Sequence, residues 1–197
     1  MTTTFTILVV CTGNVCRSPA VEALLTSALG PSSGIVVGSA GTAALVGQPI
    51  TDPMATLLSS ADAEPKGHRA RTVTRDLLAR ADLVLAVTRA HRAALVEMYP
   101  SGVRRTFTLR EFARLASDVD PAQLPPGPPG ERLAALVPLA AAQRGLAPVI
   151  PADDDVVDPY RGSSARYRTS FDQLRPAAET IASQALGDAA RSQGTPG

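Results

Sequence analysis

The chain has 197 residues, a length that suits one domain or two small ones and can bury a sizeable core. Its hydrophobic content of 45% and charged content of 19% are typical of a soluble globular protein and exclude a disordered one. The formal net charge is +1, and no basic run is long enough to suggest broad nucleic-acid binding.

The two cysteines, Cys11 and Cys16, lie in one short stretch, so the chain has no disulfide framework and we expect a cytoplasmic protein. No segment reaches a membrane-spanning length, and the N-terminus lacks the basic region of a signal peptide. No cluster of His, Cys and Asp has metal-ligand spacing, so we expect neither a metal nor another cofactor.

The first predicted elements enclose a short loop. An apolar run at 5–10 predicts a buried strand, and Pro19 with the apolar residues after it predicts a helix that ends near Gly30. Between them lies Cys-Thr-Gly-Asn-Val-Cys-Arg-Ser at 11–18. Backbone N–H groups of such a loop converge at the helix N-terminus, where they bind anions.

The side chains of this loop indicate phosphoryl transfer. The convergent N–H groups and Arg17 favour the thiolate of Cys11, and the planar guanidinium holds two phosphate oxygens. We predict that Cys11 attacks phosphorus to form a cysteinyl-phosphate and that Arg17 binds the phosphate. Gly13 and Asn14 stand where positive φ is required, and Asn tolerates it. The cradle itself is assigned to Thr12, Gly13, Asn14, Val15, Cys16, Arg17 and Ser18.

The rest of the chain alternates strands with helices. Strands are predicted at 35–37, 81–87 and 105–109, and helices from 51 and at 74–80, 89–98, 110–116, 131–143 and 164–186. This order indicates an α/β fold with a parallel sheet covered on both faces and a ligand at the carboxyl ends of its strands.

Two segments are interpreted as additions to this pattern. Residues 118–130 are rich in Pro and Gly and predict an extended loop, which with the following helix forms an insertion at 118–150. The insertion is either inert or a lid or partner surface beside the cleft. Residues 188–197 have lost periodicity and predict a flexible tail, so one domain would span 1–187.

Four motifs occur in the order in which one family carries them: V-C-T-G-N-V-C-R-S-P at 10–19, G-S-A-G-T at 38–42, H-R-A-R at 68–71 and D-P-Y at 158–160. With them the chain resembles the low-molecular-weight protein tyrosine phosphatases over 1–115 and 150–185. Residues 44–47 and 158–161 look most like the bacterial branch that serves capsule and exopolysaccharide tyrosine kinases. The resemblance implies a three-layer sandwich around four parallel strands, no cofactor, and a phosphotyrosyl protein as substrate, such as a bacterial tyrosine kinase of polysaccharide export.

Expulsion of a tyrosine oxyanion needs a proton donor. The candidates are Asp158 and the run Asp153, Asp154 and Asp155, which is most simply a solvated turn. Asp158 matches the acid of the family's D-P-Y motif, so we predict it as the general acid and base. Tyr160 is predicted to flank the substrate ring. Leu45 is predicted as an aliphatic wall where many members carry an aromatic residue.

By resemblance, Ser18, Ser39 and His68 hold Asn14 in place. Cys16 either packs under the loop or captures an oxidised Cys11 as a disulfide. His91 is interpreted as a surface residue of the helix at 89–98, and Thr88 stands where relatives often have an acidic residue.

Two other functions stay open on these residues. An arsenate reductase of the same fold would share the opening loop, and here it would depend on a small external thiol because no distal cysteine exists. An inactive module that binds oxyanions or phosphotyrosine would need neither a nucleophile nor an acid. The joint presence of Cys11, Arg17 and Asp158 argues against it.

Overall fold

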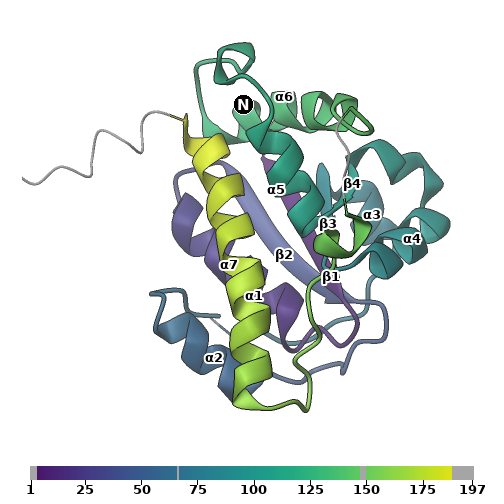
Figure 1. The fold of residues 1–197 in the computed structure, drawn as a ribbon, viewed down its shortest axis with the longest axis vertical. Coiled ribbons are helices and arrows are strands. Elements are labelled where there is room, and N and C mark those ends of the chain that lie inside the picture. Colours follow the sequence, from purple (N-terminus) through teal and green to yellow (C-terminus); the bar gives the residue numbers. More distant parts are fainter. Residues whose placement is uncertain (1–3, 66, 147–149, 188–197) are drawn as a thin grey trace, which may run out of the picture.

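The computed structural model describes residues 4–65, 67–146 and 150–187 (Figure 1). Its centre is a four-stranded parallel sheet in the order β2-β1-β3-β4. The strands are β1 (Phe5–Cys11), β2 (Ile35–Gly41), β3 (Leu83–Ala86) and β4 (Thr106–Thr108). The predicted α/β fold with four parallel strands is confirmed. The predicted tail at 188–197 lies outside the described residues.

Helices cover both faces of this sheet, because side chains alternate between the faces along β1. Ile7 and Val9 face one hydrophobic cluster, and Leu8 and Val10 face the other. The first cluster includes α1 (Arg17–Leu29), α2 (Asp52–Ser59), α5 (Leu109–Ser117), α6 (Pro129–Ala142) and α7 (Ser164–Leu186). The second includes α3 (Arg75–Arg80) and α4 (Arg89–Met98). The result is a three-layer sandwich.

Short 3-10 turns join several of these elements. They are η1 (Pro100–Arg105), η2 (Pro121–Gln123) and η3 (Pro151–Asp154). Within the described ranges, no helix combines the length and apolar character needed to cross a bilayer.

The second strand differs from its prediction in a way that matters for the site. It runs to Gly41 instead of ending at Val37, because residues 38–41 pair in register with residues 8–11 of β1. The end of β2 therefore lies directly beside Cys11. The third strand is shorter than predicted, since Ala81 still ends α3.

Within the insertion, the start of α6 lies far from the loop at 11–18. A Cβ placed on Gly130 of α6 would lie 3.3 Å from Cβ of Phe5, the first residue of β1. Cys11 is at the other end of that strand, about 20 Å away for a strand of this length. This placement argues against the lid interpretation for the described part of the insertion.

Candidate active site

The loop at 11–18 connects the end of β1 to the first turn of α1. Of the two residues predicted to need positive φ, only Asn14 has it, at 55°; the prediction for Gly13 is wrong. Gly41 supports the loop from β2, since a Cβ there would lie 2.3 Å from the Thr12 carbonyl oxygen. Only glycine permits this approach, so the end of β2 can pack directly against the loop.

The Asn14 side chain is fully buried behind the loop. Its Nδ2 donates to Ser18 Oγ at 2.9 Å and to Ser39 Oγ at 2.8 Å, and its Oδ1 accepts from the Arg71 backbone N–H at 2.9 Å. Both serines stand where the resemblance placed them, whereas Arg71 was not predicted. These contacts hold a residue whose left-handed backbone would otherwise be unfavourable.

A second set of contacts surrounds this network. His68 Nε2 lies 2.8 Å from the Asn14 backbone oxygen, so His68 contacts the main chain of Asn14 and not its side chain. Ser39 Oγ donates to Glu22 Oε2 at 2.5 Å, and Glu22 lies 3.8 Å from His68 Nδ1. Glu22, a helical carboxylate with no motif of its own, was not predicted from the sequence.

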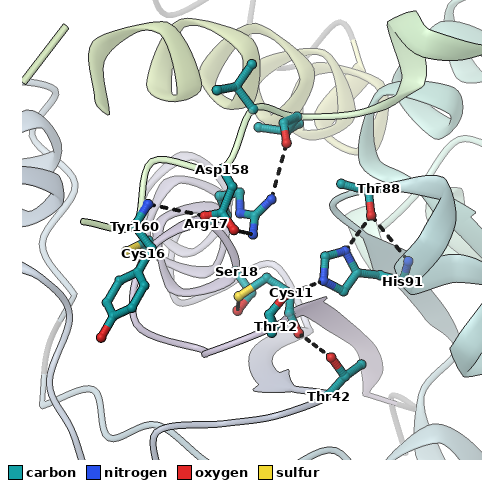
Figure 2. A network of polar contacts seen from close by, with 12 residues as sticks. Cys11, Thr12, Cys16, Arg17, Ser18, Thr42, Thr88, His91, Asp158 and Tyr160 are labelled. Carbon is teal, nitrogen blue, oxygen red and sulfur yellow. Dashed lines mark hydrogen bonds and ion pairs between the residues drawn. The ribbon is translucent and has the colours of Figure 1, made fainter. Parts of the chain in front are cut away.

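Cys11 is buried at the base of the site, where its sulfur contacts the Ser18 hydroxyl and accepts from the Asn14 backbone N–H. Sγ lies 2.9 Å from Ser18 Oγ and 3.3 Å from the Asn14 backbone nitrogen (Figure 2). Ser18 therefore contacts both Cys11 and Asn14. Hydrogen bonds of this kind stabilise a thiolate.

Arg17 and Asp158 form an ion pair beside Cys11. Arg17 Nη2 lies 2.8 Å from Asp158 Oδ2, and Arg17 Nη1 donates to the Val156 carbonyl at 3.2 Å (Figure 2). The Arg17 side chain is 5% exposed and that of Asp158 is 51% exposed. Both residues line a cavity of about 230 Å³ with Cys11, Thr12, Gly13, Val15, Cys16, Ala43, Leu45 and Tyr160.

The other three candidate acids do not line this cavity. Asp154 lies 3.4 Å from Arg114 and Asp155 lies 2.9 Å from Arg89, while Asp153 is exposed. Burial raises the pKa of Asp155, but hydrogen bonds from Arg89 outweigh it and leave this pKa lowered. Of the four candidates, only Asp158 lines the cavity.

The cavity mouth has apolar walls. Leu45 is 39% exposed and Tyr160 is 41% exposed. Each is held close to the reactive groups, because the Leu45 N–H donates to the Gly13 carbonyl and the Tyr160 N–H donates to Asp158 Oδ1. Within the part of the chain that the structure describes, no three His, Cys, Asp or Glu side chains are grouped to hold a metal ion.

Cys16 lies buried under the loop beside two hydroxyl groups. Its Sγ is 3.3 Å from Thr51 Oγ1 and 3.7 Å from the Tyr167 hydroxyl. Thr51, the N-cap residue of α2, therefore turns its hydroxyl to Cys16 and makes no side-chain cap. Burial raises the pKa of the Cys16 thiol despite these contacts. A protonated thiol attacks a sulfenate slowly, which weakens the disulfide alternative.

The interpretation of His91 as a surface residue is wrong. It is partly buried, with Nε2 2.8 Å from Thr12 Oγ1 and Nδ1 2.5 Å from Thr88 Oγ1 (Figure 2). Burial lowers the pKa of His91, and nearby Arg17 lowers it further. A signal existed in the sequence: Thr88 follows a strand and caps α4, which places His91 in the first turn at the carboxyl edge of the sheet.

Comparisons with known proteins agree with this geometry. Residues 6–123 match the sequence model of the family "Low molecular weight phosphotyrosine protein phosphatase". The probable low molecular weight protein-tyrosine-phosphatase EpsP of Ralstonia solanacearum is 38% identical over 115 residues, which are 58% of this chain and 76% of EpsP.

A second kind of relative aligns over more of the chain. The protein-arginine-phosphatase of Geobacillus stearothermophilus is 29% identical over 178 residues, 90% of this chain and 94% of its own. The solved structure of the YwlE arginine phosphatase from the same organism has a TM-score of 0.67 at 27% identity and covers 98% of this chain and 99% of its own. Because the family model matches more than half of its residues, the chain belongs to the low molecular weight phosphotyrosine protein phosphatase family.

Proposed function

We propose that this protein hydrolyses phosphotyrosine in proteins through a cysteinyl-phosphate on Cys11. The observation that carries this proposal is one cavity lined by a nucleophile, a cation and an acid, namely Cys11, Arg17 and Asp158. Leu45 and Tyr160 give the same cavity apolar walls that suit an aryl group.

In the first step, the Cys11 thiolate attacks phosphorus and forms a sulfur–phosphorus bond. The bond from phosphorus to the tyrosine oxygen breaks, and its electron pair goes to that oxygen. The carboxyl group of Asp158 gives its proton to the departing oxygen. Arg17 and the backbone N–H groups of the loop stabilise the charge on the other phosphoryl oxygens.

In the second step, water attacks the phosphorus of the cysteinyl-phosphate. The Asp158 carboxylate takes a proton from this water, the sulfur–phosphorus bond breaks, and orthophosphate leaves. The departing thiolate regains its contacts with the Ser18 hydroxyl and the Asn14 N–H, 2.9 and 3.3 Å from Sγ. Both steps conserve the total of protons and use no metal.

The Arg17–Asp158 ion pair bears on substrate entry. Arg17 contacts Asp158 through Nη2 at 2.8 Å, and the same guanidinium lines the cavity that an incoming phosphate would enter. A phosphate dianion competes for this guanidinium with two oxygens and more charge than one carboxylate. Substrate binding therefore releases Asp158 toward the leaving-group oxygen.

Arginine phosphatase activity is a second candidate, because the Geobacillus stearothermophilus relative aligns with 90% of this chain. The cavity argues for tyrosine. A phosphoarginine brings a polar, charged guanidinium, whereas Ala43, Leu45 and Tyr160 offer an apolar surface.

The proposed partner is a phosphotyrosyl protein, in particular a bacterial tyrosine kinase of polysaccharide export, on the basis of the resemblance at 44–47 and 158–161. The proposed compartment is the cytoplasm. A cysteine nucleophile works only while reduced, and both cysteines of this chain are free thiols. Dephosphorylation of an autophosphorylated kinase of this kind by the purified protein tests the partner.

The central test measures phosphate release from a phosphotyrosyl peptide, a phosphoarginyl peptide and an aryl phosphate, with reductant and a chelator present. Turnover is expected on the tyrosyl and aryl substrates. Cys11→Ser is expected to lower it by about 10⁶-fold, as removal of another enzyme's nucleophile does, while Cys16→Ser, which keeps the nucleophile, is expected to lower it far less. Wild-type protein without turnover would contradict the proposal. Preference for the arginyl peptide would favour the second candidate, and arsenate reduction coupled to a small thiol is the assay for the remaining one.

A further inference from the structure

A chain of hydrogen bonds connects helix α4 to the anion loop. Thr88, the N-cap of α4, contacts His91 Nδ1 through its hydroxyl at 2.5 Å, and His91 Nε2 contacts Thr12 Oγ1 at 2.8 Å. Figure 2 shows the imidazole between the two threonines, beside Cys11. Thr12 and His91 are 79 residues apart in the sequence, so this contact exists only because β1 and β3 are neighbours.

The backbone contact of Thr88 favours one direction for the protons of this chain. Thr88 Oγ1 accepts the backbone N–H of His91 at 3.2 Å, which leaves its own hydroxyl proton for His91 Nδ1. A neutral imidazole that accepts at Nδ1 carries its proton on Nε2. Nε2–H then donates to Thr12 Oγ1, and the Thr12 hydroxyl proton points away from His91.

Thr12 lines the cavity that also holds Cys11, Arg17 and Asp158. An anion bound in that cavity can accept a hydrogen bond from the Thr12 hydroxyl. Building on the proposed function, we infer that Thr88 and His91 orient the Thr12 hydroxyl as a side-chain donor to the phosphoryl group. His91 is thus a positioning residue that acts through Thr12.

The charges around His91 are consistent with this role. Arg17 approaches it from α1, and Asp155 and Asp158 approach it from the segment before α7. Burial and Arg17 lower the pKa of His91 and outweigh the two carboxylates, so the imidazole is neutral near pH 7. The neutral ring has one donor and one acceptor, which is what the Thr88–His91–Thr12 chain uses.

Two matched pairs of variants test the inference, with the competitive inhibition constant of inorganic phosphate as the readout. The amide of His91→Gln reaches toward the position of Nε2, while that of His91→Asn reaches only toward the position of Nδ1. Likewise, Thr12→Ser keeps the hydroxyl and Thr12→Val removes it at nearly equal volume. His91→Asn and Thr12→Val are each expected to weaken phosphate binding about tenfold, the effect of one lost hydrogen bond to a charged group. His91→Gln is expected to weaken phosphate binding less than His91→Asn does, and Thr12→Ser less than Thr12→Val does.

The double variant His91→Asn/Thr12→Val isolates the coupling. It is expected to bind phosphate no more weakly than Thr12→Val alone, because His91 acts through Thr12. Glu97→Gln, on the exposed side of α4, is the surface control, and thermal unfolding of every variant separates folding from binding. Three results would each overturn the inference. They are equal effects of His91→Gln and His91→Asn, additive effects in the double variant, and an unchanged inhibition constant of phosphate in Thr12→Val.

The tautomer gives a readout that does not depend on turnover. Nitrogen NMR of the imidazole is expected to show the His91 proton on Nε2 in the wild type, and a proton on Nδ1 of the neutral ring would overturn the inference. Phosphate affinity measured by titration also separates the two proposals. A wild type that binds phosphate without hydrolysing aryl phosphates contradicts the proposed function but leaves the inference intact. A wild type that binds no phosphate contradicts both.

Discussion

The two sides of the anion loop are built differently. Behind it, Asn14, Ser18 and Ser39 are at most 2% exposed and every polar group of the Asn14 side chain is hydrogen-bonded. In front of it, Leu45 and Tyr160 are 39% and 41% exposed. The buried side holds the shape of the cradle, and the open side meets the substrate.

This difference predicts where substitutions act. A buried polar group that loses its partner lowers the free energy of unfolding by about 1–3 kcal/mol. Substitutions behind the loop should therefore reduce activity and stability together. In the Arg17–Asp158 ion pair the Asp158 side chain is half exposed, so substitutions of Asp158 are expected to change activity far more than stability. The following four predictions test that separation, in order of decreasing effect.

Asp158→Asn is expected to lower kcat on aryl phosphates by about 10³-fold, because it removes the proton donor. The free energy of unfolding should change by less than about 1 kcal/mol, because the Asp158 side chain is half exposed and the Asn oxygen can still accept from Arg17. Phosphate should bind more tightly because a negative charge is lost beside it. Asp153→Asn, an exposed neighbour, is the control. Loss of stability together with phosphate affinity would place Asp158 with the rear network.

Asn14→Ala is expected to lower the free energy of unfolding by about 3 kcal/mol, because three buried hydrogen bonds lose their partner. Activity should fall with it, since the loop N–H groups lose their support. Asn14→Gly removes the same side chain but accepts the φ of 55° and should be about 1 kcal/mol less destabilising. Denaturant unfolding measures both. An Ala variant as stable as the wild type would show that the network does not hold the loop.

Tyr160→Ala is expected to raise KM for a phosphotyrosyl peptide about tenfold by removing one wall of the cavity. The inhibition constant of inorganic phosphate should not change, since that anion has no ring to contact. Tyr160→Phe keeps the ring and should stay close to the wild type. A parallel loss of phosphate affinity would mean that Tyr160 supports the loop itself.

The smallest effect is expected from the protonation of His91, which makes the free energy of unfolding depend on pH. Burial and Arg17 hold the folded-state pKa of His91 below 6.5, so the unfolded chain binds the proton more readily. Its contribution to stability is therefore present above about pH 6.5 and is lost as the pH falls through the folded pKa. Unfolding of the wild type should weaken between pH 7 and 5 more than that of His91→Asn. Identical pH curves would contradict the burial of the neutral ring.

Much of the site could be predicted because it is local. The strand, loop and helix around 11–18 are contiguous, and their backbone geometry follows from the apolar run, the loop residues and Pro19. The placement of Ser39 and Asp158 followed from motifs shared with a family, and no spacing rule would have supplied it. Among four neighbouring aspartates, only the fold separates Asp158 in the cavity from Asp154 and Asp155 in ion pairs.

The strand–loop–helix turn, the alternation that makes a parallel sheet, and the chemistry that Cys11 and Arg17 can perform all follow from the amino-acid sequence. Tertiary structure alone decided the contacts of Arg71 with Asn14 and of His91 with Thr12, which span 57 and 79 residues. It also decided that α6 packs against the start of β1 and away from the loop. The physical reason is that local backbone preferences act over a few residues, whereas these contacts depend on which strands are neighbours and at which end of the sheet their loops meet.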